Sequence, residues 1–463
     1  MEKADLVIKS AKIVRSWDSF EAGIAIKDGK IVAVASDAQL PAAGEVIDAA
    51  GKVVMAGVID PHVHMREPGI VEREDWITGT MAAAAGGVTT VLDHPNSIPP
   101  VNCADALHSK KEFVAQRSLV DFGLFGGAGF SSIDRIAEQA EAGAVALKTF
   151  LWPYYDRKDE FEGLFSVDDD SLLDIFEAVA QTGLVMCIHA ESKPIVEHYT
   201  KKLMSLDRTD PMLHGRSRPV LSEVEAVSRA VLFAQETGMR LNIPHISSGS
   251  ATDVVKEARD KGYDNITAET CPHYLFLTEK RMAEIGPYAK VNPPLRSQEE
   301  QDRLWEHLLG GTIGTLGSDH GPHLQEHKAR GWEDIFAGAA GSPGVETSLP
   351  LMLTAVNQHK IDLRTVTKLM SENVARLYGL YPRKGVIQVG ADADLVIVDM
   401  ARETTIDRND MYTKQKDTAR MFDGWKVTGL PITTIVRGTI IMRDREIVGN
   451  PGYGQFISPG GVD

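Results

Sequence analysis

Alternating apolar and polar side chains mark both ends of the chain. This pattern predicts β-strands in residues 6–14 and 24–36. Residues 393–399 and 433–442 are equally rich in strand-forming residues. We expect the two ends to pair into one small β-domain, the alternative being two separate β extensions.

The middle of the chain alternates continuous apolar runs with helical stretches such as 223–236 and 302–309. Buried strands that alternate with helices indicate a parallel sheet covered on both faces. Seven or eight such units favour an α/β fold of the (β/α)8 barrel type over an open doubly wound sheet. The apolar runs begin at residues 53, 87, 120, 143, 183, 240 and 313.

These patterns predict a division of the chain into three segments. Residues 53–384 would form the barrel, and residues 1–52 and 385–463 would together form a β-sandwich. The first strand of the barrel is not followed by a glycine-rich phosphate-binding motif, which argues against a dinucleotide-binding fold.

The composition mainly excludes certain classes of protein and of partner. The 463 residues are 43% hydrophobic and 25% charged, as in ordinary globular proteins. The net charge of -16 disfavours nucleic acid as a partner. Three cysteines are too few for a disulfide framework, and no apolar run resembles a signal peptide or a membrane span. We therefore expect a cytoplasmic protein without membrane contact.

Metal-ligand side chains recur where the predicted strands end. His62 and His64 follow the first barrel strand, and alternate positions of an extended segment point to the same side. Because the strands of a parallel barrel deliver their ends to one mouth, these side chains should meet there. The strand ends carry His62, His64, Lys148, His189, His245 and Asp319 with His320 beside it, a set that is hard to explain as core and predicts a metal centre at this mouth.

Longer stretches resemble the cyclic amidohydrolases, which include hydantoinases, dihydropyrimidinases, allantoinases and dihydroorotases. The resemblance covers nearly the whole chain and implies a (β/α)8 barrel with a β-sandwich built from both chain ends. It rests on 57–69 (GVIDPHVHMREPG), 79–90 (GTMAAAAGGVTT), 143–150 (GAVALKTF), 188–191 (IHAE), 245–248 (HISS), 269–275 (ETCPHYL), 292–296 (NPPLR), 317–323 (GSDHGPH) and 389–399 (VGADADLVIVD).

The resemblance implies two divalent metal ions, zinc first and manganese or cobalt as alternatives. His62 and His64 match the ligands of the more buried zinc, and His189 and His245 match those of the second zinc. Lys148 matches a lysine that carbon dioxide converts to N6-carboxylysine, an anionic bridge between the two metals.

A mechanism follows from the same resemblance. The metals would activate a water molecule, and Asp319, which also ligates the first zinc, would move its proton to the leaving ring nitrogen. Hydantoinases and dihydropyrimidinases carry a tyrosine five positions after the bridging lysine. Pro153 stands there in this chain, so either Tyr154 or Tyr155 would assist, the alternative being a packed lid aromatic.

The positions expected to contact the substrate and the other matching stretches favour two different substrate classes. Arg66, Asn96, Asn292 and His323 match the substrate contacts of dihydroorotases, and an arginine suits a carboxylate. Other stretches, such as 316–321 (LGSDHG) and 345–350 (VETSLP), are similar to L-selective hydantoinases and allantoinases.

The leading interpretation is therefore a zinc-dependent cyclic amidohydrolase of the hydantoinase or allantoinase type. It would open a cyclic ureide or imide, with a polar or carboxylate arm, to a ureido acid. Dihydroorotase is the alternative, and a mononuclear deaminase or an inactive scaffold protein is disfavoured because all six ligand types are present. Relatives of this kind are commonly tetramers or dimers, so we expect a homotetramer or homodimer.

Overall fold

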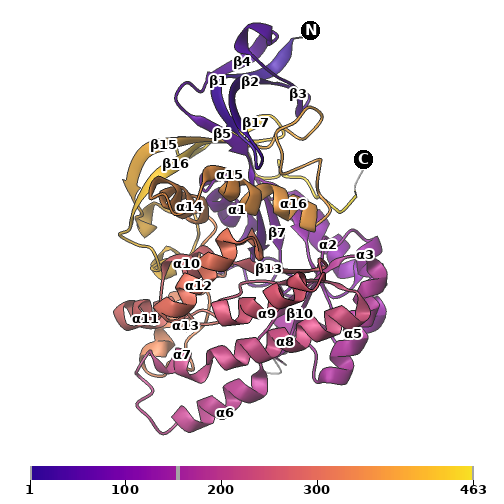
Figure 1. Ribbon diagram of the computed structural model, residues 1–463, viewed down its shortest axis with the longest axis vertical. Coiled ribbons are helices and arrows are strands. Elements are labelled where there is room, and N and C mark those ends of the chain that lie inside the picture. Colours follow the sequence, from indigo (N-terminus) through magenta and orange to yellow (C-terminus); the bar gives the residue numbers. More distant parts are fainter. Residues whose placement is uncertain (1–2, 153–156, 461–463) are drawn as a thin grey trace.

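The computed structural model describes residues 3–152 and 157–460. Strands from both chain ends form one nine-stranded mixed sheet, in the order β18-β17-β16-β15-β5-β1-β2-β3, and β4 pairs with β1. Figure 1 shows these indigo and yellow strands together at one end of the molecule. The predicted pairing of the two ends is confirmed. The strands are β1 (Ala4–Val14), β2 (Ser19–Lys27), β3 (Lys30–Ala35), β4 (Ala43–Asp48), β5 (Val53–Ala56), β15 (Leu395–Thr405), β16 (Lys426–Val436), β17 (Thr439–Arg443) and β18 (Glu446–Ile447).

Strand β5 joins the contributions of the two ends. It runs parallel to β1 on one side and antiparallel to β15 on the other. The apolar run that starts at residue 53 predicts one barrel strand, but the structure divides it at Gly57. A β-carbon there would lie 2.3 Å from the side chain of Thr89, so only glycine allows this close approach. The run therefore serves the terminal sheet first and the barrel second.

The barrel follows, built from parallel strands. β8 and β9 are two parts of one barrel position, separated by Phe125, whose N–H donates to the carbonyl of Asp93 at 2.9 Å. A parallel bridge between Val63 and His320 links the first strand to the segment after the last. The barrel strands are β6 (Val58–Val63), β7 (Val88–Asp93), β8 (Asp121–Leu124), β9 (Gly126–Gly127), β10 (Leu147–Phe150), β11 (Val185–His189), β12 (Arg240–Ile243), β13 (Ile266–Thr270) and β14 (Ile313–Leu316).

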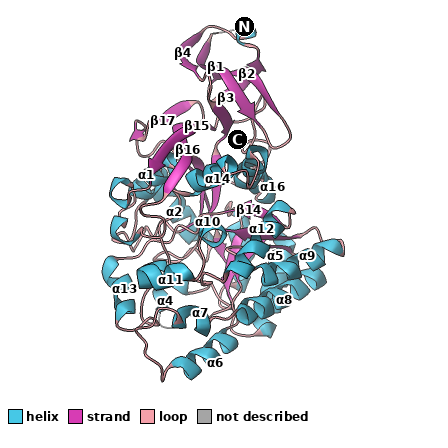
Figure 2. Ribbon diagram, turned by 60° about the vertical axis from the view of Figure 1, so that its left-hand side comes forward, coloured by secondary structure: helices cyan, strands magenta, loops and turns pink. Residues whose placement is uncertain are grey.

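Helices surround these strands, so the predicted barrel with its β-domain is confirmed (Figure 2). Within the described residues, no helix is both long and apolar enough to span a membrane. The helices are α1 (Trp76–Ala85), α2 (Ala104–Ala115), α3 (Ile136–Glu141), α4 (Lys158–Phe161), α5 (Asp169–Thr182), α6 (Lys193–Leu203), α7 (Leu213–Ser217), α8 (Val220–Thr237), α9 (Gly249–Asp260), α10 (Pro272–Phe276), α11 (Lys280–Ile285), α12 (Gln298–Leu309), α13 (Gln325–Ala329), α14 (Ser348–Asn357), α15 (Leu363–Thr367) and α16 (Asn373–Leu377).

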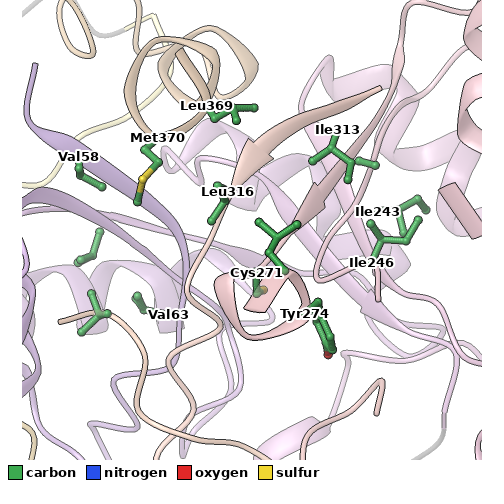
Figure 3. Close-up of a cluster of buried hydrophobic side chains, with 14 of the residues drawn as sticks. Val58, Val63, Ile243, Ile246, Cys271, Tyr274, Ile313, Leu316, Leu369 and Met370 are labelled. Carbon is green, nitrogen blue, oxygen red and sulfur yellow. The ribbon is translucent and has the colours of Figure 1, made fainter. Parts of the chain in front are cut away.

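A continuous apolar layer packs the barrel strands against their helices (Figure 3). Leu316 of β14 and Leu369 of the π-helical turn η6 (Lys368–Glu372) belong to this layer, and both are buried. Truncating a buried leucine of this kind to alanine costs about 2–5 kcal/mol. The rigid layer fixes the ends of the strands, which is where the candidate site lies.

A buried ion cluster ties the terminal segments to the barrel. The ammonium of Lys384 lies 2.6 Å from carboxylate oxygens of Asp121 and Asp394 and 3.0 Å from Asp392. The C-terminal segment also lies beside β8, where the N–H of Phe122 donates to the carbonyl of Gln455 at 2.9 Å. The barrel and the terminal segments therefore share one buried network.

Candidate metal centre

The six predicted ligand side chains come from five strand ends and line one cavity of about 550 Å³. Their imidazole rings form a single cluster. The ring centroids of His62 and His245 lie 5.1 Å apart, and those of His189 and His245 lie 4.9 Å apart. The structure therefore brings the predicted set together at the C-terminal mouth of the barrel, as the strand pattern predicted.

The Nε2 atoms of His62 and His64 both face the carboxylate of Asp319, and their Nδ1 atoms contact other side chains. Nδ1 of His62 lies 3.1 Å from Oε1 of Glu269, and Nδ1 of His64 lies 2.8 Å from Oδ1 of Asn96. Their Nε2 atoms both lie 3.4 Å from Oδ1 of Asp319. One ligand atom from each of these three residues falls within 4.8 Å of the others, so the group can hold a cation.

The protonation states of this group suit a metal site. Burial lowers the pKa of His62 and of His64, which keeps both imidazoles neutral with a lone pair to donate. Burial opposes ionisation of Asp319, but His64, His273 and Lys148 together outweigh it and lower the pKa of the carboxyl. Two neutral imidazoles beside one carboxylate form an ordinary zinc ligand set.

The second pair of histidines uses opposite ring nitrogens. Nδ1 of His189 lies 3.3 Å from Nε2 of His245, and Nε2 of His189 lies 2.9 Å from Oε2 of Glu191. Burial lowers the pKa of His245 well below its usual range. The two nitrogens can share a hydrogen bond, or both can turn a lone pair toward a cation bound between the rings.

Lys148 stands within the same cluster without a direct hydrogen-bond or ion-pair partner among the described residues. Its side chain is 1% exposed, and Nζ has no hydrogen-bond partner among the described residues. Burial lowers the pKa of Lys148 to about 8. An orphaned, easily neutralised amine among four imidazoles fits a lysine that becomes an anionic bridge, because carbon dioxide reacts with the neutral amine.

The predicted substrate contacts also line the cavity, and three of them leave polar atoms unused. Nε and Nη1 of Arg66, Oδ1 of Asn292 and Nδ1 of His323 are buried without a hydrogen-bond partner in the described part of the chain. Asn96 differs, because its Oδ1 already faces His64. The structure thus gives Asn96 a position beside a candidate ligand. Tyr154 and Tyr155 lie outside the described residues.

Sequence reasoning missed several residues of the site. Glu191 contacts His189, and Arg73 and Arg157 share the carboxylate of Glu160 near Arg66. His94 stacks on His62 with ring centroids 3.7 Å apart. Glu191 could have been found, because it follows His189 by two positions. The contact of Arg73 with Glu160 joins a loop to helix α4, 87 residues away in the sequence, so no local pattern indicates it.

The fold and this site define a barrel protein that gathers candidate metal ligands at its strand ends. Residues 53–441 match the model of the amidohydrolase family. The chain is 38% identical to an L-hydantoinase of Paenarthrobacter aurescens over 98% of both chains. It is 36% identical to an allantoinase of Deinococcus radiodurans, over 98% of this chain and 99% of that protein.

Solved structures agree with these matches. The L-hydantoinase (dihydropyrimidinase) from Arthrobacter aurescens superposes with a TM-score of 0.94 at 38% identity, over 98% of this chain and all of that one. A D-hydantoinase superposes with a TM-score of 0.90 at 33% identity, over 98% of each chain. The chain belongs to the amidohydrolase family.

Proposed function

We propose that this protein hydrolyses the cyclic amide bond of a hydantoin- or allantoin-like ureide and releases a ring-opened ureido acid. The observation that carries the proposal is the convergence of two histidine pairs, Lys148 and Asp319 on one cavity. The names of the relatives, L-hydantoinase and allantoinase, support the same reaction class.

We assign two divalent metal ions to this cluster, zinc being the first choice because the ligands are imidazoles and carboxylates. His62, His64 and Asp319 would hold one ion, and His189 and His245 the other. Lys148 would bridge them as N6-carboxylysine: its neutral Nζ forms a bond to the carbon of carbon dioxide and loses a proton. When bound, such ions supply an activated water and polarise the ring carbonyl.

Asp319 has the position and charge for proton transfer. Its lowered pKa leaves it ionised at neutral pH, so the carboxylate can accept the proton of the attacking water. It can then give that proton to the ring nitrogen, which must be protonated to leave. Asp319 has a left-handed backbone with φ of 48°, and its Oδ1 lies 3.4 Å from Nε2 of both His62 and His64.

A specific observation favours a substrate with a carboxylate arm. Arg66 is 5% exposed, yet two of its guanidinium nitrogens have no partner within the described chain. Among the described residues, Arg66, Arg73 and Arg157 all lie near the carboxylate of Glu160, so several cationic side chains gather on this side of the cavity. A buried, unsatisfied guanidinium is costly, and a carboxylate would satisfy it. Dihydroorotate is therefore the second candidate.

The reaction is tested with hydantoin, allantoin, dihydrouracil, dihydroorotate and 5-carboxymethylhydantoin, incubated with zinc- or manganese-loaded protein. Ring opening without ammonia release is the expected result, since ammonia would indicate a deaminase. Asp319→Asn should lower kcat by at least about 100-fold, because the amide cannot accept the proton. Failure to open any ring, or a kcat within about tenfold of the wild type in Asp319→Asn, would contradict the proposal.

The carboxylate arm is tested with Arg66→Met. Losing one charged hydrogen-bond partner should lower kcat/KM for carboxylated rings about 10–150-fold and leave neutral rings nearly unchanged. Arg330→Met serves as the control, because Arg330 also lines the cavity but is exposed. An equal loss for carboxylated and neutral rings in Arg66→Met would show that Arg66 is a structural residue.

A further inference from the structure

The second histidine pair contacts a buried carboxylate that lies outside the predicted ligand set. Glu191 is fully buried, and its Oε2 lies 2.9 Å from Nε2 of His189. The same oxygen accepts a hydrogen bond from Nη1 of Arg218 at 2.5 Å. His189, Glu191 and Arg218 therefore form a continuous line from the centre of the cluster to the cavity wall.

The contact with Glu191 determines which ring nitrogen of His189 keeps a lone pair to offer to a metal ion. An ionised carboxylate can only accept hydrogen bonds, so Nε2 of His189 must carry the proton. The lone pair then remains on Nδ1, the atom that lies 3.3 Å from Nε2 of His245. A neutral partner, such as an amide, could donate as well as accept, and the ring could then keep its proton on the wrong nitrogen.

Arg218 makes an ionised carboxylate possible at this depth. A fully buried charge without a counter-charge is strongly unfavourable, and Arg218 supplies that counter-charge. The arginine is held in turn, because Nη1 of Arg296 donates to its carbonyl at 2.5 Å. Arg296 also donates to the hydroxyl of Ser247 at 2.9 Å, two residues after His245. The network thus contacts His189 directly and reaches the loop that carries His245 through Ser247.

We propose that Glu191 is a positioning residue for the second metal ion and that Arg218 acts through it. Glu191 fixes the tautomer and orientation of His189, and Arg218 keeps Glu191 charged. Arg218 also lines the substrate cavity, with its guanidinium carbon 5.2 Å from the ring centroid of Trp152. The inference rests on the proposed two-metal site and extends it to residues that the metals would not touch.

The experiment measures metal binding by the full-length protein, without any substrate. Glu191→Gln and Arg218→Met are stripped of metal and titrated with Zn²⁺, and Co²⁺-loaded samples give the visible spectrum of each site. We expect about 10–100-fold weaker binding at one of the two sites, with the other site unchanged. The Co²⁺ spectrum should lose the contribution of that one site, and Arg218→Lys should restore part of the affinity because the charge is kept.

Glu346→Gln is the matched control. Glu346 is also a buried glutamate paired with an arginine, Arg445, at 2.7 Å, but it contacts no candidate ligand. It should lose stability and keep both metal ions. If Glu191→Gln does not fold, Arg218→Met decides the question, since its side chain is 15% exposed at the cavity wall.

Two results would overturn the inference. Either Glu191→Gln and Arg218→Met bind two Zn²⁺ ions with wild-type affinity and spectrum, or Glu346→Gln weakens one site to the same extent. Failure of the proposed function looks different, because the wild-type protein itself would then not bind two ions.

Discussion

At the scale of single residues, Lys148 has the least usual environment of the candidate ligands. It is buried among histidines, and no carboxylate within the described residues pairs with its ammonium group. Burial lowers its pKa to about 8, so the share of neutral amine increases as the pH rises from mildly acidic to mildly basic values. Carboxylation, and with it metal uptake, should therefore become more favourable as the pH rises through this range at constant dissolved carbon dioxide.

Replacing Lys148 by alanine should remove most of the bound metal and the activity, because two cations would lose the anion between them. Metal content after gel filtration and the rate of ring opening are the two measurements. Short carboxylic acids added to Lys148→Ala should restore part of the activity by taking the place of the lost carboxylate. Wild-type activity of the variant without additives would contradict the two-metal site.

Residues of the site differ in how visible they are in the sequence. Histidines in an i, i+2 pair and a lysine at a strand end can be recognised because strand geometry alone brings them to one mouth. Glu191 follows His189 by two positions and could have been recognised from that spacing, but Arg218 lies 27 residues further on, and a lone arginine has no distinctive pattern. The candidate ligands could therefore be predicted, whereas the contact between Glu191 and Arg218 required the structure.

At the scale of elements, the apolar pattern located most barrel strands but not every boundary. β13 (Ile266–Thr270) was not marked by an apolar run, because Thr267, Glu269 and Thr270 interrupt it. Glu269 points inward and faces His62, so a polar residue that interrupts the apolar pattern of this strand belongs to the site. Sequence alone also does not reveal that the segment before α14 forms a cavity wall, which depends on packing between distant loops.

That wall supplies a prediction about Gly341. Its φ is 138°, and a β-carbon would lie 2.4 Å from the carbonyl oxygen of Gly321 and 3.0 Å from the ring of His323. Gly341→Ala should displace both segments and lower kcat/KM about 10–100-fold. Steady-state kinetics check this. Gly262→Ala is the control, since Gly262 also has positive φ but nothing within 4 Å, and it should change stability alone.

At the scale of the whole molecule, the cluster around Lys384 joins segments that are far apart in the sequence. Asp121 begins strand β8, whereas Asp392 and Asp394 precede β15 of the terminal sheet. Arg437 also contacts Asp121, at 3.1 Å. The barrel and terminal sheet should therefore lose stability together when this cluster is disrupted.

Lys384→Met tests this, because it leaves three buried carboxylates without their central cation. We expect a loss of at least about 3 kcal/mol, seen as a Tm lower by several degrees. Lys30→Met removes another partner of Asp392, but Lys30 is 45% exposed, and its loss should cost below about 1 kcal/mol. Similar Tm values for the two variants would show that the cluster is not a stabilising junction.

The shared terminal sheet also determines the order in which the protein can be completed on the ribosome. β5 ends at Ala56, but its neighbour β15 begins only at Leu395. One edge of β5 therefore stays unpaired until the entire barrel has been translated. At ordinary translation rates this interval lasts tens of seconds. During that time the nascent chain exposes an unpaired strand edge, the feature most prone to pairing with another chain. Slow translation or a shortage of chaperones should therefore lower the yield of folded protein, because the segment that ends at Ala56 stays available to pair with another chain.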